Sequence, residues 1–162
     1  MQAAYSKDPY TQVGAKIGTN DNVPLGSGYN GPPPDINDKS FSWARPDADT
    51  PADEVNKNDL VIHAEINAIV RSDKRALRDA TLYITALPCK ECMKFIVYSG
   101  IKRIVYMDFR SSAGGILQDM SQRKKALEIA KMGGVKIEKF KGSIGWIYDW
   151  VHALNEKGVF AI

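Results

Sequence analysis

Two short motifs, at residues 63–65 and 88–92, constrain the fold more than any other feature, because their side chains suit one metal ion. The first reads H-A-E and the second P-C-K-E-C. An imidazole and two thiolates are good zinc ligands, and a catalytic zinc site has three protein ligands and one exchangeable position. His63, Cys89 and Cys92 are therefore the candidate ligands. Glu65 is the candidate proton carrier beside the open position, so the fold must bring both motifs together.

The residues around each motif predict a helix that begins at it. Ile62, Ile66, Ile69 and Val70 recur at helical spacing, which places the first motif at or near a helix N-terminus. The β-rich run 81–85 predicts a strand, and Pro88 suits the first turn of the helix that follows it. Exposed N–H groups at a helix start, and a metal, both lower the pKa of nearby thiols. Two converging helix N-termini are thus a plausible site geometry.

Each motif alone has a more ordinary explanation. A single H-x-E usually contains a satisfied surface or core histidine, and a single C-x-x-C can be a redox pair. A thioredoxin-like redox motif follows the first strand of a βαβ unit, whereas this one lies in mid-chain, after the H-x-E. Both cysteines of the chain belong to this one motif. The combination therefore favours a metal site.

Length and composition are those of an ordinary globular protein. The 162 residues, 44% of them apolar, suffice for a single domain with its own core, spanning residues 1–162. A net charge of +3 does not demand nucleic acid, and a phosphorylated small molecule suits it equally well. Reduced cysteines favour the cytoplasm. No apolar run has transmembrane length, and residues 1–5 lack the apolar core of a secretion signal, so we expect no membrane association.

Strand-like and helix-like segments alternate along the chain. We expect strands at 13–17, 25–29, 81–85, 103–107 and 135–140, and an amphipathic helix over 118–132. A further helical stripe lies within 142–162, whose Trp146 and Trp150 cover either the core or a subunit interface. This alternation predicts an α/β layer sandwich around one sheet. Residues 35–58 form a long polar segment, either a functional loop or a disordered insertion.

Seven sequence phrases, together with the spacing of the two motifs, point to a family. H-x-E followed by P-C-x-x-C is the signature of zinc-dependent nucleobase deaminases. The chain resembles the cytidine deaminase superfamily and, within it, the deoxycytidylate (dCMP) deaminases, over residues 6–140. The phrases are Ser6–Pro9, Thr11–Ala15, Gly28–Gly31, Trp43–Arg45, His63–Ile69, Pro88–Cys92 and Ser99–Lys102. S-K-D-P and G-Y-N-G narrow the resemblance to dCMP deaminases. The similar tRNA adenosine deaminases usually have methionine where this chain has Glu91.

The resemblance implies a three-layer α/β/α sandwich around a mixed five-stranded sheet, with one catalytic Zn²⁺ per subunit. It also implies conversion of dCMP and water to dUMP and ammonia, which feeds dTMP synthesis. Glu65 would protonate N3 of the cytosine and then the departing amine. Asn30 would hydrogen-bond the deoxyribose, and the backbone around Ala64 would read the edge of the base.

The resemblance implies further substrate contacts, and each of them has an alternative explanation. Ser6 and Lys7 are candidates for the phosphate, the alternative being a solvated turn. Phe109, in preference to Arg110, falls near the position where the family has an aromatic residue close to the substrate. The alternative is that it is an exposed loop residue. The chain has no cysteine left for a second, structural zinc.

Family members are commonly hexamers that dCTP activates and dTTP inhibits, so we expect a homo-oligomer, a hexamer by resemblance. The candidate effector-binding residues are Gly28, Tyr29 and Gly31. In this chain Pro32–Pro34 stiffen the loop, and Asp35 stands where the family often has glycine. Asp35 repels an effector phosphate unless a metal such as Mg²⁺ bridges them. Both retained regulation and lost feedback therefore remain open.

Three functions compete at this point. The leading one is a dCMP deaminase, with acceptance of dCTP left open. The second is a tRNA- or polynucleotide-directed deaminase, which needs a basic groove that 22 basic against 19 acidic residues hardly supply. The third is a non-catalytic nucleotide-binding assembly module, which the intact Glu65 disfavours.

Overall fold

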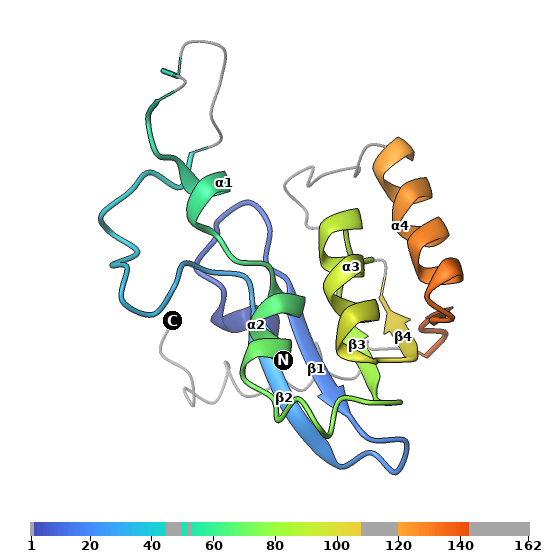
Figure 1. Cartoon of the computed structure of the whole chain (residues 1–162). Helices are drawn as coiled ribbons and strands as arrows, with labels where there is room; N and C mark the ends of the chain where they lie inside the picture. The colour runs from blue at the N-terminus through green and yellow to red at the C-terminus, as the bar shows by residue number, and fades with distance from the viewer. Residues whose placement is uncertain (1, 45–49, 52, 108–119, 143–162) are drawn as a thin grey trace.

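The computed structural model describes residues 2–44, 50–51, 53–107 and 120–142 (Figure 1). Its elements in chain order are η1 (Gln2–Tyr5), β1 (Gly14–Gly18), β2 (Pro24–Tyr29), α1 (Lys57–Leu60), α2 (Ala64–Val70), β3 (Thr81–Ile84), α3 (Lys90–Ser99), β4 (Arg103–Tyr106), α4 (Met120–Met132) and β5 (Lys136–Lys139).

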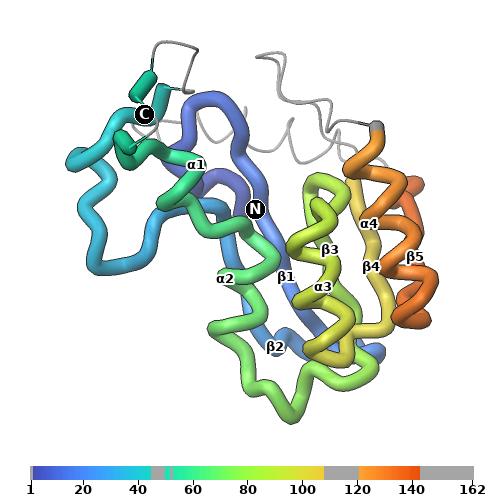
Figure 2. Tube along the Cα trace, turned by 45° about the horizontal axis from the view of Figure 1, so that its top comes forward, coloured from blue at the N-terminus to red at the C-terminus, as the bar shows by residue number. Residues whose placement is uncertain are grey.

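The strands form one mixed five-stranded sheet in the order β2-β1-β3-β4-β5. β1 is antiparallel to both β2 and β3, whereas β3, β4 and β5 are parallel. Right-handed crossovers that step in one direction place their helices on one face of a sheet. α3 and α4 accordingly lie on the same face, and α2 lies beside them across β1 and β2 (Figure 2). The mixed five-stranded sheet predicted for the family is confirmed.

The core lies between the sheet and this helical layer. Ile17, Leu82 and Ile104 are in register on neighbouring strands and fully buried. They belong to one buried cluster with residues of α3 and α4, namely Met93, Ile96, Ala126 and Ala130. Full burial of one such large apolar side chain contributes about 1.5–3 kcal/mol. The first turns of α2 and α3 are therefore supported by a well-packed core.

Glycines in β2 allow α2 to approach the sheet closely. A Cβ atom added at Gly28 would lie 2.5 Å from both the carbonyl oxygen of Ala64 and the amide nitrogen of Ala68. These are backbone atoms of the helix that follows His63, so they cannot move without moving the helix. The backbone of α2 therefore lies directly against β2 at Gly28.

We therefore expect Gly28→Ala to destabilise the protein by about 1–3 kcal/mol, because it overpacks the interface between β2 and α2. Equilibrium unfolding in urea measures this. Gly31→Ala is the matched control, since its added Cβ would meet Tyr29 ring carbons at 3.6 and 3.8 Å, which is ordinary contact. The control should change stability by less than about 0.5 kcal/mol. Equal stability of the two variants would contradict the close approach.

The opposite face of the sheet is contacted near its β1–β2 end by η1. A Cβ at Gly14 would lie 2.2 Å from the backbone nitrogen of Ala3, so this short helix rests directly on β1. The helical extension expected over residues 142–162 lies, from residue 143 onward, outside the described residues. No described helix combines the length and the apolar character needed to cross a membrane.

Part of the long polar segment after β2 has local structure of its own. The Trp43 indole donates to the Asp38 carbonyl at 3.0 Å, and the Ser40 hydroxyl donates to the Asn37 carbonyl at 2.6 Å. The segment ends in α1, a single turn that begins with a capping box between Asn56 and Asp59. The sequence did not predict α1, because a single turn carries no readable period.

Candidate metal centre and active site

The candidate ligands lie where the starts of α2 and α3 meet. His63 is the N-cap residue of α2 but makes no side-chain capping bond, so its imidazole is available elsewhere. Cys89 is the N-cap of α3, and its sulfur accepts a hydrogen bond from the Cys92 backbone N–H at 3.4 Å. The predicted convergence of two helix N-termini is confirmed.

The donor atoms have the spacing that a tetrahedral zinc ion requires. His63 Nδ1 lies 3.6 Å from Cys89 Sγ and 3.3 Å from Cys92 Sγ. All three donor atoms lie within 4.8 Å of one another. Zn–N and Zn–S bonds of about 2.05 and 2.3 Å at a tetrahedral angle separate nitrogen from sulfur by about 3.6 Å. The donor set therefore fits zinc in both chemistry and spacing.

The two thiols differ in acidity because they are hydrogen-bonded to each other. That bond is the largest of the causes that lower the pKa of Cys89 to about 4. The same bond, followed by burial, raises the pKa of Cys92. The pKa of His63 is raised, first by its hydrogen bond to Cys89. Negative charge is thus concentrated beside the imidazole, and coordination to a cation would deprotonate the second thiol as well.

Glu65 lies in the first turn of α2 and is 4% exposed. Burial is the largest cause that raises the pKa of its carboxyl group. The charge of His63 and a hydrogen bond with Cys92 lower this pKa, whereas the charge of Cys89 raises it, so the carboxyl group lies within electrostatic range of all three candidate ligands. A carboxyl group with a raised pKa beside a metal site suits proton transfer near neutral pH.

Ser6 and Lys7, the candidates for phosphate contact, have very different surroundings. Ser6 is 3% exposed, and its hydroxyl donates to the Asn30 carbonyl at 2.9 Å, so it is not part of a solvated turn. The Lys7 side chain is 69% exposed and pairs with Asp38 at 2.8 Å. Their contact with phosphate stays a prediction.

Asn30, the candidate for deoxyribose binding, is 6% exposed and holds the loop before β1. Its Oδ1 accepts from the Val13 N–H at 2.7 Å, and its Nδ2 donates to the Thr11 carbonyl at 2.8 Å. An amide has two donor hydrogens and two acceptor positions, so one of each is left for a ligand. This arrangement is compatible with a contact between Asn30 and the deoxyribose, which stays a prediction.

The remaining predicted residues occupy separate places. Ala64 is buried in the first turn of α2, and Gly28 packs beneath that helix. Gly31 pairs with Ile62 in an antiparallel bridge immediately before His63. The Tyr29 ring has the Arg71 guanidinium 5.9 Å from its centroid. Phe109 lies outside the described residues.

Sequence reasoning missed three polar residues that organise this region. Asn67 donates from Nδ2 to the Tyr29 carbonyl at 2.8 Å and so links α2 to the end of β2. Asp8 and Lys57 form a buried ion pair of 3.0 Å. Asp8 belongs to the S-K-D-P phrase and could have been singled out there. Lys57 carries no such signal, because lysine is normally exposed.

Comparison with known proteins agrees with this geometry. Residues 1–108 match the family described as the cytidine and deoxycytidylate deaminase zinc-binding region. The "Deoxycytidylate deaminase" of Mus musculus is 34% identical over 140 residues, which cover 86% of this chain and 74% of that protein. The "Probable deoxycytidylate deaminase" of Caenorhabditis elegans is 40% identical over 105 residues, 65% of this chain and 51% of that protein.

A solved structure gives the same fold. The crystal structure of a dCMP deaminase from the cyanophage S-TIM5 in apo form has a TM-score of 0.57 and 25% sequence identity to this chain. The likeness covers 86% of this chain and 88% of that one. The family match over residues 1–108 includes both motifs that build the metal centre. The chain belongs to the cytidine and deoxycytidylate deaminase family and is a deaminase of that family.

Proposed function

We propose that this protein hydrolyses dCMP to dUMP and ammonia. One observation carries the proposal: three zinc-type donors lie within 4.8 Å of one another, with the buried carboxyl group of Glu65 beside them. The relatives named as deoxycytidylate deaminases support the choice of dCMP among cytosine compounds.

His63, Cys89 and Cys92 would hold the metal. A zinc ion bound there supplies Lewis-acid polarisation and lowers the pKa of water. Hydrolysis adds the elements of water across the C4–N3 bond of cytosine, with oxygen going to C4 and hydrogen to N3. The Glu65 carboxylate accepts the proton that the water loses and delivers it to N3. It then carries the proton of the new C4 hydroxyl group to the amino nitrogen on C4, so that the bond between C4 and the amino nitrogen breaks, the C4 carbonyl of dUMP forms and ammonia leaves.

Substrate contacts complete the proposal. Asn30 binds the deoxyribose through its remaining donor and acceptor, and the backbone at Ala64 reads the base. Ser6 and Lys7 contact the phosphate, in which case Lys7 exchanges Asp38 for the substrate. Phe109 lies close to the base.

Finer features follow the family. The dUMP formed would supply dTMP synthesis in the cytoplasm, and the pocket would also admit dCTP. The enzyme would be a homohexamer, with dCTP and dTTP as its candidate effectors and loss of feedback as the alternative. The effector, with Mg²⁺, would bind at Gly28, Tyr29 and Gly31, and the cation of Arg71 beside the Tyr29 ring suits an anionic nucleotide there. The Mg²⁺ ion would offset the repulsion between the effector phosphates and the Asp35 carboxylate.

Ammonia release from dCMP, dCTP, cytidine and a tRNA hairpin, each with and without a zinc chelator, tests the proposal. We expect dCMP to give the highest kcat/KM and the chelator to abolish turnover. Turnover of the tRNA hairpin alone would replace the proposal with a polynucleotide-directed deaminase. Absence of turnover on all four compounds by zinc-loaded protein would favour the non-catalytic binding module. A dTTP titration in the same assay shows whether feedback inhibition is retained.

A further inference from the structure

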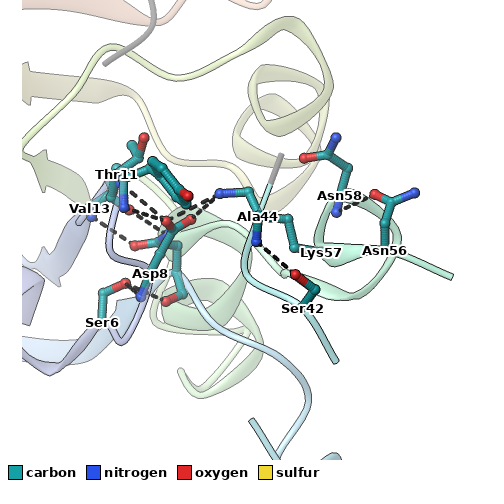
Figure 3. Close-up of polar contacts among 11 residues, drawn as sticks. Ser6, Asp8, Thr11, Val13, Ser42, Ala44, Asn56, Lys57 and Asn58 are labelled. Carbon is teal, nitrogen blue, oxygen red and sulfur yellow. Dashed lines mark hydrogen bonds and ion pairs between the residues drawn. The ribbon is translucent and has the colours of Figure 1, made fainter. Parts of the chain in front are cut away.

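A buried ion pair connects the N-terminal turn to α1. Lys57 Nζ lies 3.2 and 3.0 Å from the two carboxylate oxygens of Asp8. The side chains of both residues are less than a tenth exposed. Figure 3 shows the Lys57 side chain reaching from α1 to Asp8. Its ammonium also lies 4.9 Å from the centroid of the Tyr10 ring.

This pair is what attaches α1 to the rest of the described structure through a buried side chain. α1 has four residues, all described, and Lys57 is the buried one. Residues 53–55 before it are exposed. A single helical turn has no stability of its own, so tertiary contacts must fix its place. The buried charged side chain of Lys57 therefore attaches α1 to the fold, as a buried apolar face attaches most helices.

The backbone leads directly from this anchor to the metal ligand. The Val61 N–H donates to the Lys57 carbonyl at 2.9 Å and closes α1. Ile62 then exchanges two hydrogen bonds with Gly31, of 2.9 and 3.1 Å. The next residue is His63, whose carbonyl accepts from the Asn67 N–H. No mobile linker separates the anchor from His63 along residues 57–63.

The Asp8 end of the pair is fixed by the same part of the fold. Asp8 Oδ1 accepts from the N–H groups of Tyr10 and Thr11 at 2.9 and 3.2 Å. The Thr11 carbonyl is held by the side chain of Asn30, which directly precedes Gly31. From Lys57 the chain leads to Ile62, and from Asp8 the hydrogen bonds lead through Thr11 and Asn30 to Gly31. The ion pair and the Gly31–Ile62 bridge therefore close a network next to His63.

Buried ion pairs add little net stability, because removing two charges from water offsets most of their attraction. Because this pair belongs to the closed network, it can fix the position of residues near His63. We propose that Asp8 and Lys57 are positioning residues, which fix the His63 imidazole where it can bind zinc together with the two thiolates. This inference rests on the proposed function in one respect, namely that the three donors hold zinc.

The test is the double variant Asp8→Asn/Lys57→Met. The asparagine Oδ1 still accepts from Tyr10 and Thr11, the methionine fills the volume of the lysine stem, and no buried charge is left unpaired. We expect the purified variant to bind Zn²⁺ and Co²⁺ on the order of 10-fold more weakly, as for other residues that orient a metal ligand. The visible bands of tetrahedral Co²⁺ should also change. The thermal midpoint without metal should stay near that of the wild type.

Two further variants sharpen the result. Arg103→Met/Glu138→Gln removes an ion pair of 2.6 Å between β4 and β5 and is the matched control, with metal binding unchanged. Lys57→Arg keeps the charge and should keep most of the affinity. If the main variant does not fold, Asp8→Asn alone is measured in its place, with the same expected loss of affinity.

The outcomes separate the two proposals. Wild-type protein that binds neither Zn²⁺ nor Co²⁺ would overturn the proposed function. Wild-type binding, together with equal affinity and identical Co²⁺ bands in the folded Asp8 variant, would overturn the positioning role and leave the pair as a structural contact.

Discussion

Glu65→Gln is expected to lower kcat for dCMP by about 100- to 10,000-fold while zinc stays bound. Glutamine keeps the size of the side chain but can neither accept the proton of water nor deliver it to N3. Acid–base catalysis by one positioned side chain has this weight, which corresponds to about 3–5 kcal/mol of transition-state stabilisation. Steady-state kinetics gives kcat, and metal analysis of the same sample gives the zinc content.

The structure indicates that this loss will not come from unfolding. Glu65 is 4% exposed, and burial raises the pKa of its carboxyl group, so the native fold holds an ionisable group at a cost. A neutral amide of the same shape should leave the thermal midpoint unchanged or higher. Catalytic groups held at such a cost are a common source of the trade-off between stability and activity.

Glu91→Gln is the matched control for this result. Glu91 is also in the first turn of a helix that begins at the metal centre, but it is exposed and pairs with Lys90 and Lys94. We expect kcat and zinc content to be unchanged. Near-normal turnover by the Glu65 variant, or an equal loss in both variants, would show that Glu65 is not the proton carrier.

The metal centre was predictable because its chemistry lies in two short motifs with strong local signals. The helical spacing of Ile62, Ile66 and Ile69 placed His63 at a helix start. Pro88 did the same for Cys89, and both placements are confirmed. Neither argument needed tertiary information, since each depends on residues within one or two helical turns.

The network around Asp8 and Lys57 was not predictable, because it joins segments that are far apart in sequence and uses residues expected at the surface. Single turns such as η1 and α1 carry no hydrophobic period, so neither was expected. The sequence of β2 alone could not show that α2 is the element that approaches Gly28 so closely. These are effects of packing between distant segments, which local patterns do not encode.

Cys92→Ser is expected to remove zinc and, with it, turnover. Cys92 Sγ lies 3.3 Å from His63 Nδ1, and the residue is 3% exposed, so it is a buried member of the three-donor cluster. A serine hydroxyl is not among the usual protein ligands of zinc, and two ligands would remain of the three. Purified variant should contain far less than one zinc ion per chain, and its kcat/KM for dCMP should fall below detection.

Thermal unfolding provides a second measurement that does not depend on turnover. A ligand that binds the native state at 1,000 times its Kd stabilises it by about 4 kcal/mol, which for a chain of this size raises the midpoint by roughly 8–16 °C. We expect a zinc-dependent shift of this order in the wild type and none in Cys92→Ser. Ser99→Ala, which removes a hydrogen bond of 2.8 Å to the Ile96 carbonyl near the other end of α3, should unfold slightly earlier but keep the full zinc shift. A Cys92 variant that still carries about one zinc ion per chain, or that shows the wild-type shift, would mean that the metal is held by other groups.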